Sequence, residues 1–138
     1  MLNEVQIEGL VARDSWTYDK DLFFRIASYR DADMPAKPDV IPGRDEPDYV
    51  NIRYQGGATS LFAPRKGMRL RVHGYLQSRD FKESMADFLE KARRSGGEIP
   101  VIETQDKIQI DRNIVEVVAT RVIVLDDNTR NKNSAQNK

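Results

Sequence analysis

The chain reads KGMRLRVHGYLQSRDF at residues 66–81, and this stretch is its clearest alternation. In an extended strand, successive side chains point to opposite faces of the sheet. One face therefore carries Leu70, Val72, Gly74 and Leu76. The other carries Arg69, Arg71, His73, Tyr75, Gln77, Arg79 and Phe81. The pattern predicts a strand over 68–81 with an apolar face for a core and a basic, aromatic face turned outward.

Four further stretches have the composition of strands, at residues 4–13, 21–30, 48–55 and 114–125. In the second of these, Phe24 and Ile26 share one face, and Arg25 and Tyr29 share the other. If the alternation of the third stretch, at 48–55, continues without a bulge, Tyr54 belongs to the core. Trp16 is expected in the turn between the first two strands, where it either stacks on a base or closes a barrel end. A short helical turn is expected at 58–64, after Gly56-Gly57.

The connections between these strands differ in character. Residues 32–47 hold four prolines, at positions 35, 38, 42 and 47, and prolines lack the amide donor that a sheet needs, so a long exposed loop is predicted. Residues 82–95 place Met85, Phe88, Leu89 and Ala92 on one helical stripe, which predicts an amphipathic helix that must bury this stripe. Residues 99–112 are expected to form an irregular hairpin, and 127–138 a polar, disordered tail.

Composition narrows the class of protein. The chain has 138 residues, which suits one domain, and 39% of them are hydrophobic. It has no cysteine and one histidine, His73, so a zinc site and a thiol nucleophile are not expected; His73 is expected on a strand surface or in an interface. No membrane span or signal peptide is visible, which fits a cytoplasmic protein. Lys plus Arg and Asp plus Glu both number 22, so any anion site must be local.

The sequence gives little support to an enzyme. Gly56-Gly57 lacks the lysine pattern of a phosphate loop, and no nucleophile elbow is present. Asp31, Asp33, Asp45, Glu46 and Asp48 are close together, but they lie in the proline-rich loop, where a solvated acidic surface is the simplest interpretation. No cofactor or metal is expected.

The order of these elements predicts an all-β fold. Five strands with a short helical segment between the third and fourth is the order of the five-stranded OB-fold, a small Greek-key barrel. An amphipathic helix would then be inserted before the last strand. We expect residues 1–126 to form this domain, with 82–112 as the inserted helix and hairpin.

Five short motifs occur in one order along the chain. They are Met1-Leu2-Asn3 with Gly9-Leu10, Phe24-Arg25-Ile26-Ala27-Ser28-Tyr29-Arg30, Asp48-Tyr49-Val50-Asn51, Lys66-Gly67 followed by Gly74-Tyr75-Leu76-Gln77-Ser78-Arg79-Asp80-Phe81, and Glu116-Val117-Val118-Ala119. In this order they resemble the bacterial single-stranded DNA-binding proteins, over roughly residues 1–81 and 112–125. The resemblance implies an OB fold that binds single-stranded DNA with little sequence preference, usually as a homotetramer. It also implies a part in replication, recombination, repair or mobile-element transfer.

The chain departs from that family in three places. The segment from the third strand to Lys66-Gly67 is shorter than usual, which leaves the register of Tyr54 open. The connection after Phe81 is longer, and residues 131–138 lack the acidic, Phe-terminated tip that recruits replication and repair enzymes. A divergent member is therefore expected, and its protein partners are unknown. A phage, plasmid or integrated mobile element is a guess at its origin. An OB-fold module for RNA, or for a protein complex of a phage or conjugative element, is the alternative.

The candidate DNA-binding residues are the outward ones on three strands: Arg25, Tyr29, Tyr49, Arg53, Arg71, Tyr75, Arg79 and Phe81. Aromatic rings stack on unpaired bases and arginines neutralise phosphates. The resemblance supports Tyr49, Arg79 and Phe81 best, because the family carries aromatic or basic contacts at the matching positions. Each choice has a structural alternative. For Arg71 and Arg79 the alternative is an ordinary solvated strand charge. For Tyr49 and Tyr75 it is burial under the Phe88 helix or in a subunit interface. For Phe81 it is the first position of the helix stripe, packed on Met85.

Overall fold

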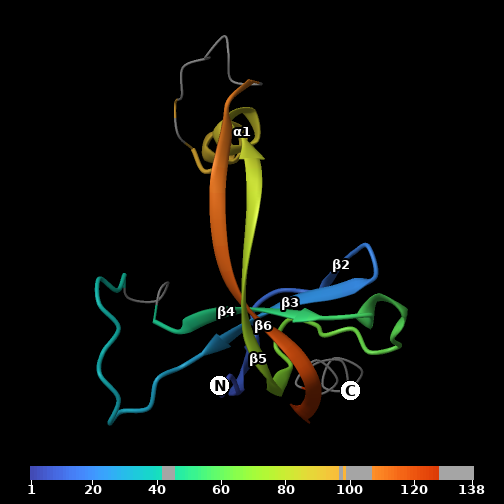
Figure 1. Cartoon of the computed structure of the whole chain (residues 1–138). Helices are drawn as coiled ribbons and strands as arrows, with labels where there is room; N and C mark the ends of the chain where they lie inside the picture. The colour runs from blue at the N-terminus through green and yellow to red at the C-terminus, as the bar shows by residue number, and fades with distance from the viewer. Residues whose placement is uncertain (42–45, 97, 99–106, 128–138) are drawn as a thin grey trace, which may run out of the picture. The chain divides into compact units, whose positions relative to one another are not determined.

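The computed structural model describes residues 1–41, 46–96, 98 and 107–127. Its elements in chain order are β1 (Val5–Val11), β2 (Trp16–Tyr18), β3 (Asp21–Ser28), β4 (Asp48–Tyr54), the 3-10 helix η1 (Gly57–Thr59), β5 (Arg69–Ser84), α1 (Met85–Arg94) and β6 (Gln109–Asp126) (Figure 1). The chain divides into two compact units. We call them the barrel unit, Met1–Gln77 with Glu116–Lys138, and the insert unit, Ser78–Val115.

The barrel unit is a closed ring of five strands. Around the ring, β1 is antiparallel to β5, β5 adjoins β6, β6 is parallel to β4, and β4 is antiparallel to β3. The ring closes where Leu10 and Val11 of β1 pair with Ala27 and Ile26 of β3. Because closure removes exposed sheet edges, a small barrel of this kind is stable as a unit. The predicted OB-fold, with a short helical segment between the third and fourth ring strands, is confirmed.

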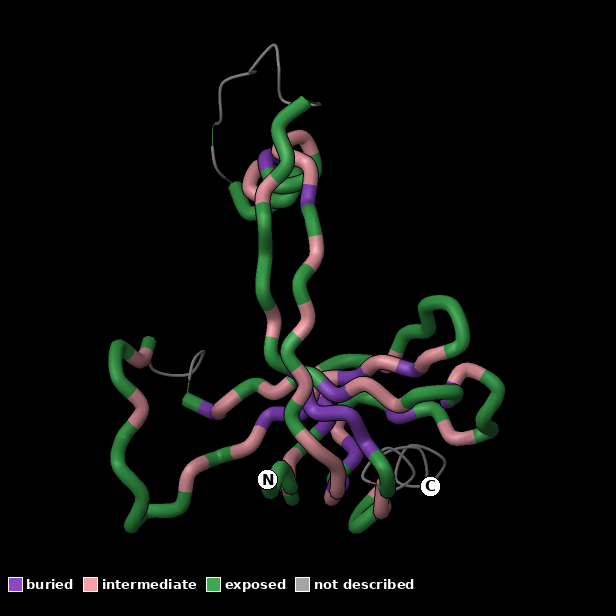
Figure 2. Tube along the Cα trace, viewed as in Figure 1, coloured by how far each residue is buried: buried purple, intermediate pink, exposed green. Residues whose placement is uncertain are grey.

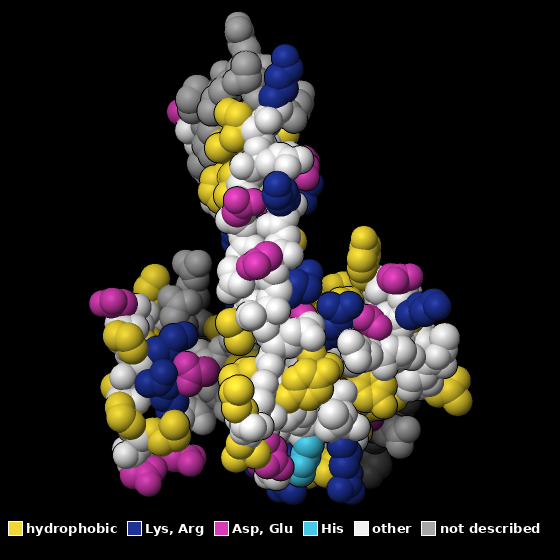
Figure 3. All heavy atoms as spheres, in the orientation of Figure 1, with side chains coloured by type: hydrophobic (Ala, Val, Ile, Leu, Met, Phe, Trp, Pro, Cys, Tyr) yellow, Lys and Arg dark blue, Asp and Glu magenta, His cyan; other side chains and the backbone are white. Residues whose placement is uncertain are grey.

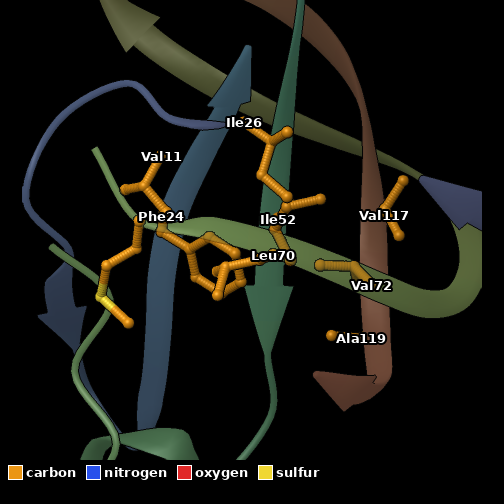
Figure 4. Close-up of a cluster of buried hydrophobic side chains, with 9 residues drawn as sticks. Val11, Phe24, Ile26, Ile52, Leu70, Val72, Val117 and Ala119 are labelled. Atoms are coloured by element: carbon orange, nitrogen blue, oxygen red, sulfur yellow. The ribbon is translucent and has the colours of Figure 1, made fainter. Parts of the chain in front are cut away.

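The core of the barrel follows from the alternation. Phe24, Ile26, Leu70 and Val72 are each 0% exposed, and they pack with Val11, Ile52, Met68, Val117 and Ala119. Figure 4 shows these side chains converging from β1, β3, β4, β5 and β6, and Figure 2 shows buried residues on the same strands. Tyr54 packs against this cluster, as its position in the alternation predicted.

Two glycines allow the strands of the ring to approach closely. A Cβ atom on Gly9 would lie 2.3 Å from Ile26 Cγ2 and 2.4 Å from the Ala27 carbonyl oxygen, at the point where β1 closes on β3. A Cβ atom on Gly74 would lie 2.0 Å from the Val118 carbonyl oxygen. Such distances are far below van der Waals contact, so any larger residue would push the strands apart.

The barrel differs from the sequence prediction in two details. Trp16 lies on a short additional strand, β2, which pairs with β3 outside the ring, rather than in a turn. The turn lies between β2 and β3, where Asp19 adopts a left-handed conformation with φ of 56°. Leu76 was predicted to face inward with Leu70 and Val72, but it is 47% exposed. The core cluster takes no β5 residue beyond Val72, so Leu76 has no apolar layer to enter.

The insert unit has its own polar centre. Glu83 is only 7% exposed, and its carboxylate accepts hydrogen bonds from Lys91 Nζ of α1 at 2.6 Å and from an Arg112 guanidinium nitrogen of β6 at 3.2 Å. Ser84 caps α1 by accepting from the Asp87 amide at 3.1 Å. In the predicted apolar stripe of the helix, Leu89 is buried, whereas Phe88 is 40% exposed.

Several boundaries in the insert unit also differ from the prediction. Strand β5 runs to Ser84, so Phe81 is a strand residue and the alternative that it begins the helix stripe is wrong. Strand β6 begins at Gln109, so 109–112 are strand rather than part of an irregular hairpin. The remainder of that predicted hairpin, at 99–106, and the predicted disordered tail, at 128–138, lie outside the described residues.

Candidate nucleic-acid interface

The outer face of β3 and β4 brings several of the predicted residues together. Inward residues such as Phe24 and Ile52 alternate with outward ones, and the strand register sets the outward neighbours. Phe23 lies opposite Arg53, Arg25 opposite Asn51, and Ala27 opposite Tyr49. The face therefore combines aromatic, basic and amide side chains on two adjacent strands of a rigid barrel.

Tyr49 is the centre of one group on this face, which we call the Tyr49 cluster (Arg25, Lys37 and Tyr49). The Arg25 guanidinium carbon lies 4.6 Å from the centroid of the Tyr49 ring, and Lys37 Nζ lies 5.9 Å from it. Lys37 is anchored by a hydrogen bond of 3.0 Å from its Nζ to the Pro47 carbonyl oxygen. Tyr49 is 39% exposed, so the alternative that it is buried is wrong within this chain.

Arg25 has an unusual environment for a half-buried arginine. No hydrogen bond from its side chain or ion pair is present among the described residues, and its Nε is buried without a hydrogen-bond partner. An unpaired buried donor costs about 1–3 kcal/mol of folding stability. The Arg25 guanidinium lies over the exposed Tyr49 ring and has no carboxylate beside it among the described residues. Its positive charge can therefore bind an external anion.

A second group lies on the same face, and we call it the Trp16 row (Arg13, Trp16, Phe23 and Arg53). The Trp16 and Phe23 rings are stacked with centroids 6.0 Å apart and planes 14° apart. Arg13 lies over the Trp16 ring at 4.4 Å, and Arg53 lies over the Phe23 ring at 5.5 Å. Sequence reasoning did not select Phe23, although a signal existed. In the Phe23-Phe24 pair an inward Phe24 requires an outward Phe23.

Arg53 differs from Arg25 because its charge is balanced within the protein. Its guanidinium donates to Asp21 Oδ2 at 2.7 Å and lies 3.6 Å from Glu116 Oε1. The Gly56 amide, which donates to Asp21 at 3.0 Å, and the Arg53 guanidinium together hold the pKa of Asp21 below its ordinary value. The hydrogen bond to Asp21 likewise raises the pKa of Arg53. Arg53 therefore acts first as a support for Phe23 rather than as an open phosphate contact.

The predicted residues on β5 lie in a different part of the barrel. In the strand order β6 separates β5 from β4, and Arg71 pairs across β1 instead. Its Nε donates to Glu8 Oε1 at 2.7 Å, and Arg69 reaches the same carboxylate at 3.5 Å. The hydrogen bond from Arg71 lowers the pKa of Glu8. Arg71 is thus a paired charge on the strand surface, and Tyr75, further along β5, is half-buried.

The remaining predicted residues are placed as follows. Tyr29 follows β3 and is 60% exposed. Arg79 and Phe81 belong to the insert unit, where the Arg79 guanidinium lies 5.7 Å from the Phe81 ring centroid. Phe81 lines an open pocket of about 520 Å³ together with neighbours that include Lys82 and Arg112. Arg79 and Phe81 form a basic and aromatic pair of their own.

The acidic residues of the loop do not build a metal site in the part of the chain that the structure describes. No group of three or more His, Cys, Asp or Glu residues there could hold a metal ion. Asp48 instead accepts two hydrogen bonds from Arg30, at 2.8 and 3.1 Å, which lower its pKa. Among the described residues, no helix is long and apolar enough to cross a membrane.

Comparisons with known proteins identify the fold. No family model and no curated protein matches the chain. Solved structures do match, including a Plasmodium falciparum SSB in complex with single-stranded DNA, at 18% identity and a TM-score of 0.51, covering 91% of this chain and 96% of that one. The chain shares its fold with single-stranded DNA-binding proteins.

Two further structures carry the same fold. A mitochondrial single-stranded DNA-binding protein from S. cerevisiae matches at 14% identity and a TM-score of 0.51, over 91% of this chain and 96% of that one. The N-terminal domain of a PriB protein from Thermoanaerobacter tencongensis, a dimeric structure, matches at 15% identity and a TM-score of 0.50, over 91% and 98%. These identities are low, so the agreement lies in the fold.

Proposed function

We propose that the chain binds single-stranded DNA with little sequence preference through the outer face of β3 and β4. The Tyr49 cluster carries this proposal: an exposed ring lies beside two cations, and Arg25 has no carboxylate partner among the described residues. Single strands offer unpaired base faces next to phosphates, and every base has a face on which a ring can stack. The cluster therefore matches both parts of a nucleotide without reading its identity.

The predicted residues take unequal parts in this proposal. Tyr49 stacks on a base, while Arg25 and Lys37 neutralise phosphates or stack on a neighbouring base. Tyr29 extends the face at the end of β3, and Arg53 supports it. Arg71 contributes less because Glu8 already balances its charge. Tyr75 on β5 is a secondary contact of the barrel unit, and the pair of Arg79 and Phe81 is a separate contact of the insert unit.

The fold comparisons supply the wider setting of the proposal. One similar structure is of an SSB in complex with single-stranded DNA, and another is a dimer. We infer a non-catalytic protein of the single-stranded DNA-binding type that acts as a homo-oligomer, a tetramer by family resemblance, in the cytoplasm. It would protect single strands during replication, recombination, repair or the transfer of a mobile element.

A second candidate function is an OB-fold module for RNA or for a protein complex of a phage or conjugative element. The balanced charge of the chain, 22 basic against 22 acidic residues, favours it. The side of the molecule that is turned to the viewer in Figure 3 likewise carries basic, acidic and hydrophobic side chains. A protein that covers long stretches of nucleic acid commonly presents a more uniformly basic surface.

Fluorescence anisotropy of labelled oligo-dT, read against salt, tests the proposal. We expect binding that weakens steeply as salt rises, and poor competition by double-stranded DNA, whose bases are hidden. Replacing Tyr49 with alanine should weaken binding about 5- to 150-fold, which corresponds to about 1–3 kcal/mol for one stacked base.

Phe88→Ala is the matched control for Tyr49→Ala, because Phe88 is 40% exposed and Tyr49 39%. Absence of oligo-dT binding by folded protein at low salt would overturn the proposal. Equal losses in the two variants would overturn the role of Tyr49. Tighter binding of oligo-U than of oligo-dT would favour the RNA module.

A further inference from the structure

The Trp16 row has a geometry that the Tyr49 cluster does not explain. The strand pairings Trp16 with Phe23 and Phe23 with Arg53 align these residues across β2, β3 and β4. The two rings stack nearly parallel, the Arg13 guanidinium lies over the Trp16 ring, and the Arg53 guanidinium lies over the Phe23 ring. Two stacked rings with a guanidinium over each form one column of planar groups, with Arg13 and Trp16 at its β2 end and Arg53 at its β4 end.

The two ends of this column differ in charge. Arg53, at one end, is bound to Asp21 at 2.7 Å and lies 3.6 Å from the buried carboxylate of Glu116. Arg13, at the other end, makes no ion pair and no side-chain hydrogen bond among the described residues, and it is exposed. Trp16 itself is 38% exposed. The Arg53 end is therefore a fixed support, whereas the Arg13 end presents an uncompensated cation stacked on an indole.

We propose that the Arg13 and Trp16 end of this column is a second base-stacking station for the nucleic-acid strand that the Tyr49 cluster binds. This inference rests on the proposed function. A base stacks on the indole or on the guanidinium above it, and Arg13 pairs with the adjoining phosphate. The column supplies the stacking surface, and its supported end at Arg53 keeps Phe23 and Trp16 in place before the ligand arrives.

The separation of the two stations sets the ligand. Trp16 lies opposite Phe23 and Tyr49 opposite Ala27, and these two β3 residues are about 13 Å apart along the strand, at about 3.3 Å per residue. Because β2 and β4 lie on opposite sides of β3, about 10 Å across the sheet is added, and the stations are about 16 Å apart. A stacked strand advances about 3.4 Å per nucleotide, so about five nucleotides connect the stations. The ligand class is thus a single strand of more than about five nucleotides, within the range of about 4–16 nucleotides that one OB fold covers.

A second copy of this chain is the competing occupant. Strand β2 is the last strand in the order of the sheet, so its outer edge has no partner strand among the described residues. An exposed ring beside a cation that has no carboxylate partner among the described residues favours nucleic acid as the occupant. A second β2 edge is disfavoured because it would bring another Arg13 close to the first, and the two positive charges would repel. The oligomeric state of a Trp16 variant separates the two occupants.

The experiment uses the fact that Trp16 is the only tryptophan of the chain, so tryptophan emission, excited selectively over that of the five tyrosines, reports on this station alone. Oligo-dT binding is followed at once by anisotropy of a labelled oligonucleotide and by Trp16 emission. With oligonucleotides longer than about five nucleotides, we expect quenching of Trp16 that saturates together with anisotropy. Tyr49→Ala should weaken binding but leave the quenching at saturation in place.

Variants at the station complete the test. Trp16→Leu should weaken binding of the longer oligonucleotides about 5- to 150-fold, and Trp16→Phe should restore much of the loss. Arg13→Gln should lower the slope of log affinity against log salt by about 0.7, the value for one phosphate on a single strand. Tyr18→Leu is the control on the same strand, since Tyr18 is 76% exposed and makes no ring contact with any described residue. If Trp16→Leu fails to fold, Trp16→Phe and Arg13→Gln carry the same test.

The outcomes distinguish the two levels of inference. Anisotropy without any change in Trp16 emission, together with unchanged affinity in Trp16→Leu, overturns the second station and leaves the proposed function standing. Absence of binding in anisotropy overturns the proposed function and the station with it. A smaller oligomer in Trp16→Leu at unchanged affinity assigns the row to an interface between copies, and so overturns the station.

Discussion

Replacing Arg25 with methionine should reduce the salt dependence of oligo-dT binding more than the same change at Arg71. On single strands, each neutralised phosphate contributes about 0.7 to the slope of log affinity against log salt. Arg25 has no carboxylate partner among the described residues, so its loss should remove about that amount. Arg71 lies 2.7 Å from the Glu8 carboxylate, and Arg69 lies 3.5 Å from the same group. Because Glu8 partly neutralises the positive charge of Arg71, the slope should change much less when Arg71 is replaced.

The same structure predicts that this loss of binding leaves folding intact. Arg25→Met removes a cation–π contact with Tyr49, worth about 0.5–1 kcal/mol at an exposed site. It also removes a buried Nε that has no hydrogen-bond partner, which costs the wild-type protein about 1–3 kcal/mol. The two effects oppose each other, and the second is the larger. The variant should therefore unfold at the same temperature as the wild type or slightly above it.

The measurement is anisotropy of labelled oligo-dT from about 50 to about 200 mM NaCl, with thermal unfolding of each variant alongside. An Arg25→Met slope equal to that of the wild type would refute the reasoning, since it would mean that Arg25 contacts no phosphate. A slope reduced as much by Arg71→Met would also refute it, because pairing with Glu8 would then make no difference.

Two further predictions concern the frame that holds the face. Gly74→Ala should destabilise the barrel by about 3 kcal/mol or more in denaturant unfolding, because its Cβ would meet the Val118 carbonyl oxygen at 2.0 Å, and backbone atoms cannot move aside as a side chain does. Gly56→Asn should cost far less, since that position has open space and asparagine tolerates its φ of 71°; similar costs would contradict the steric argument. Asp21→Asn should cost about 1–2 kcal/mol at neutral pH. The folded pKa of Asp21 lies below its ordinary 3.8, so its contribution is present above that pH and is lost as pH falls below it. A gap between wild type and variant that stays constant down to pH values well below 3.8 would contradict the assignment.

Much of the barrel was readable from the residues alone. Alternation assigned Phe24, Ile26, Leu70 and Val72 to the core, and all four are fully buried. The order of strands and the short helical segment indicated the OB-fold, which the ring of strands confirms. The sequence pattern did not predict β2, because a strand of three residues is too short for a two-residue period to show.

What the sequence by itself determined is which side chains face inward, because the two-residue period of a strand is local and each residue carries it. Only the tertiary structure decided which of the outward arginines are open to a ligand. Arg71 meets Glu8, 63 residues away, and Arg53 meets Asp21, 32 residues away, because strand pairing brings these partners together. Arg25 faces Tyr49 instead and has no carboxylate partner in the part of the chain that the structure describes. Charge pairing depends on the register between strands distant in sequence, and no local pattern encodes that register.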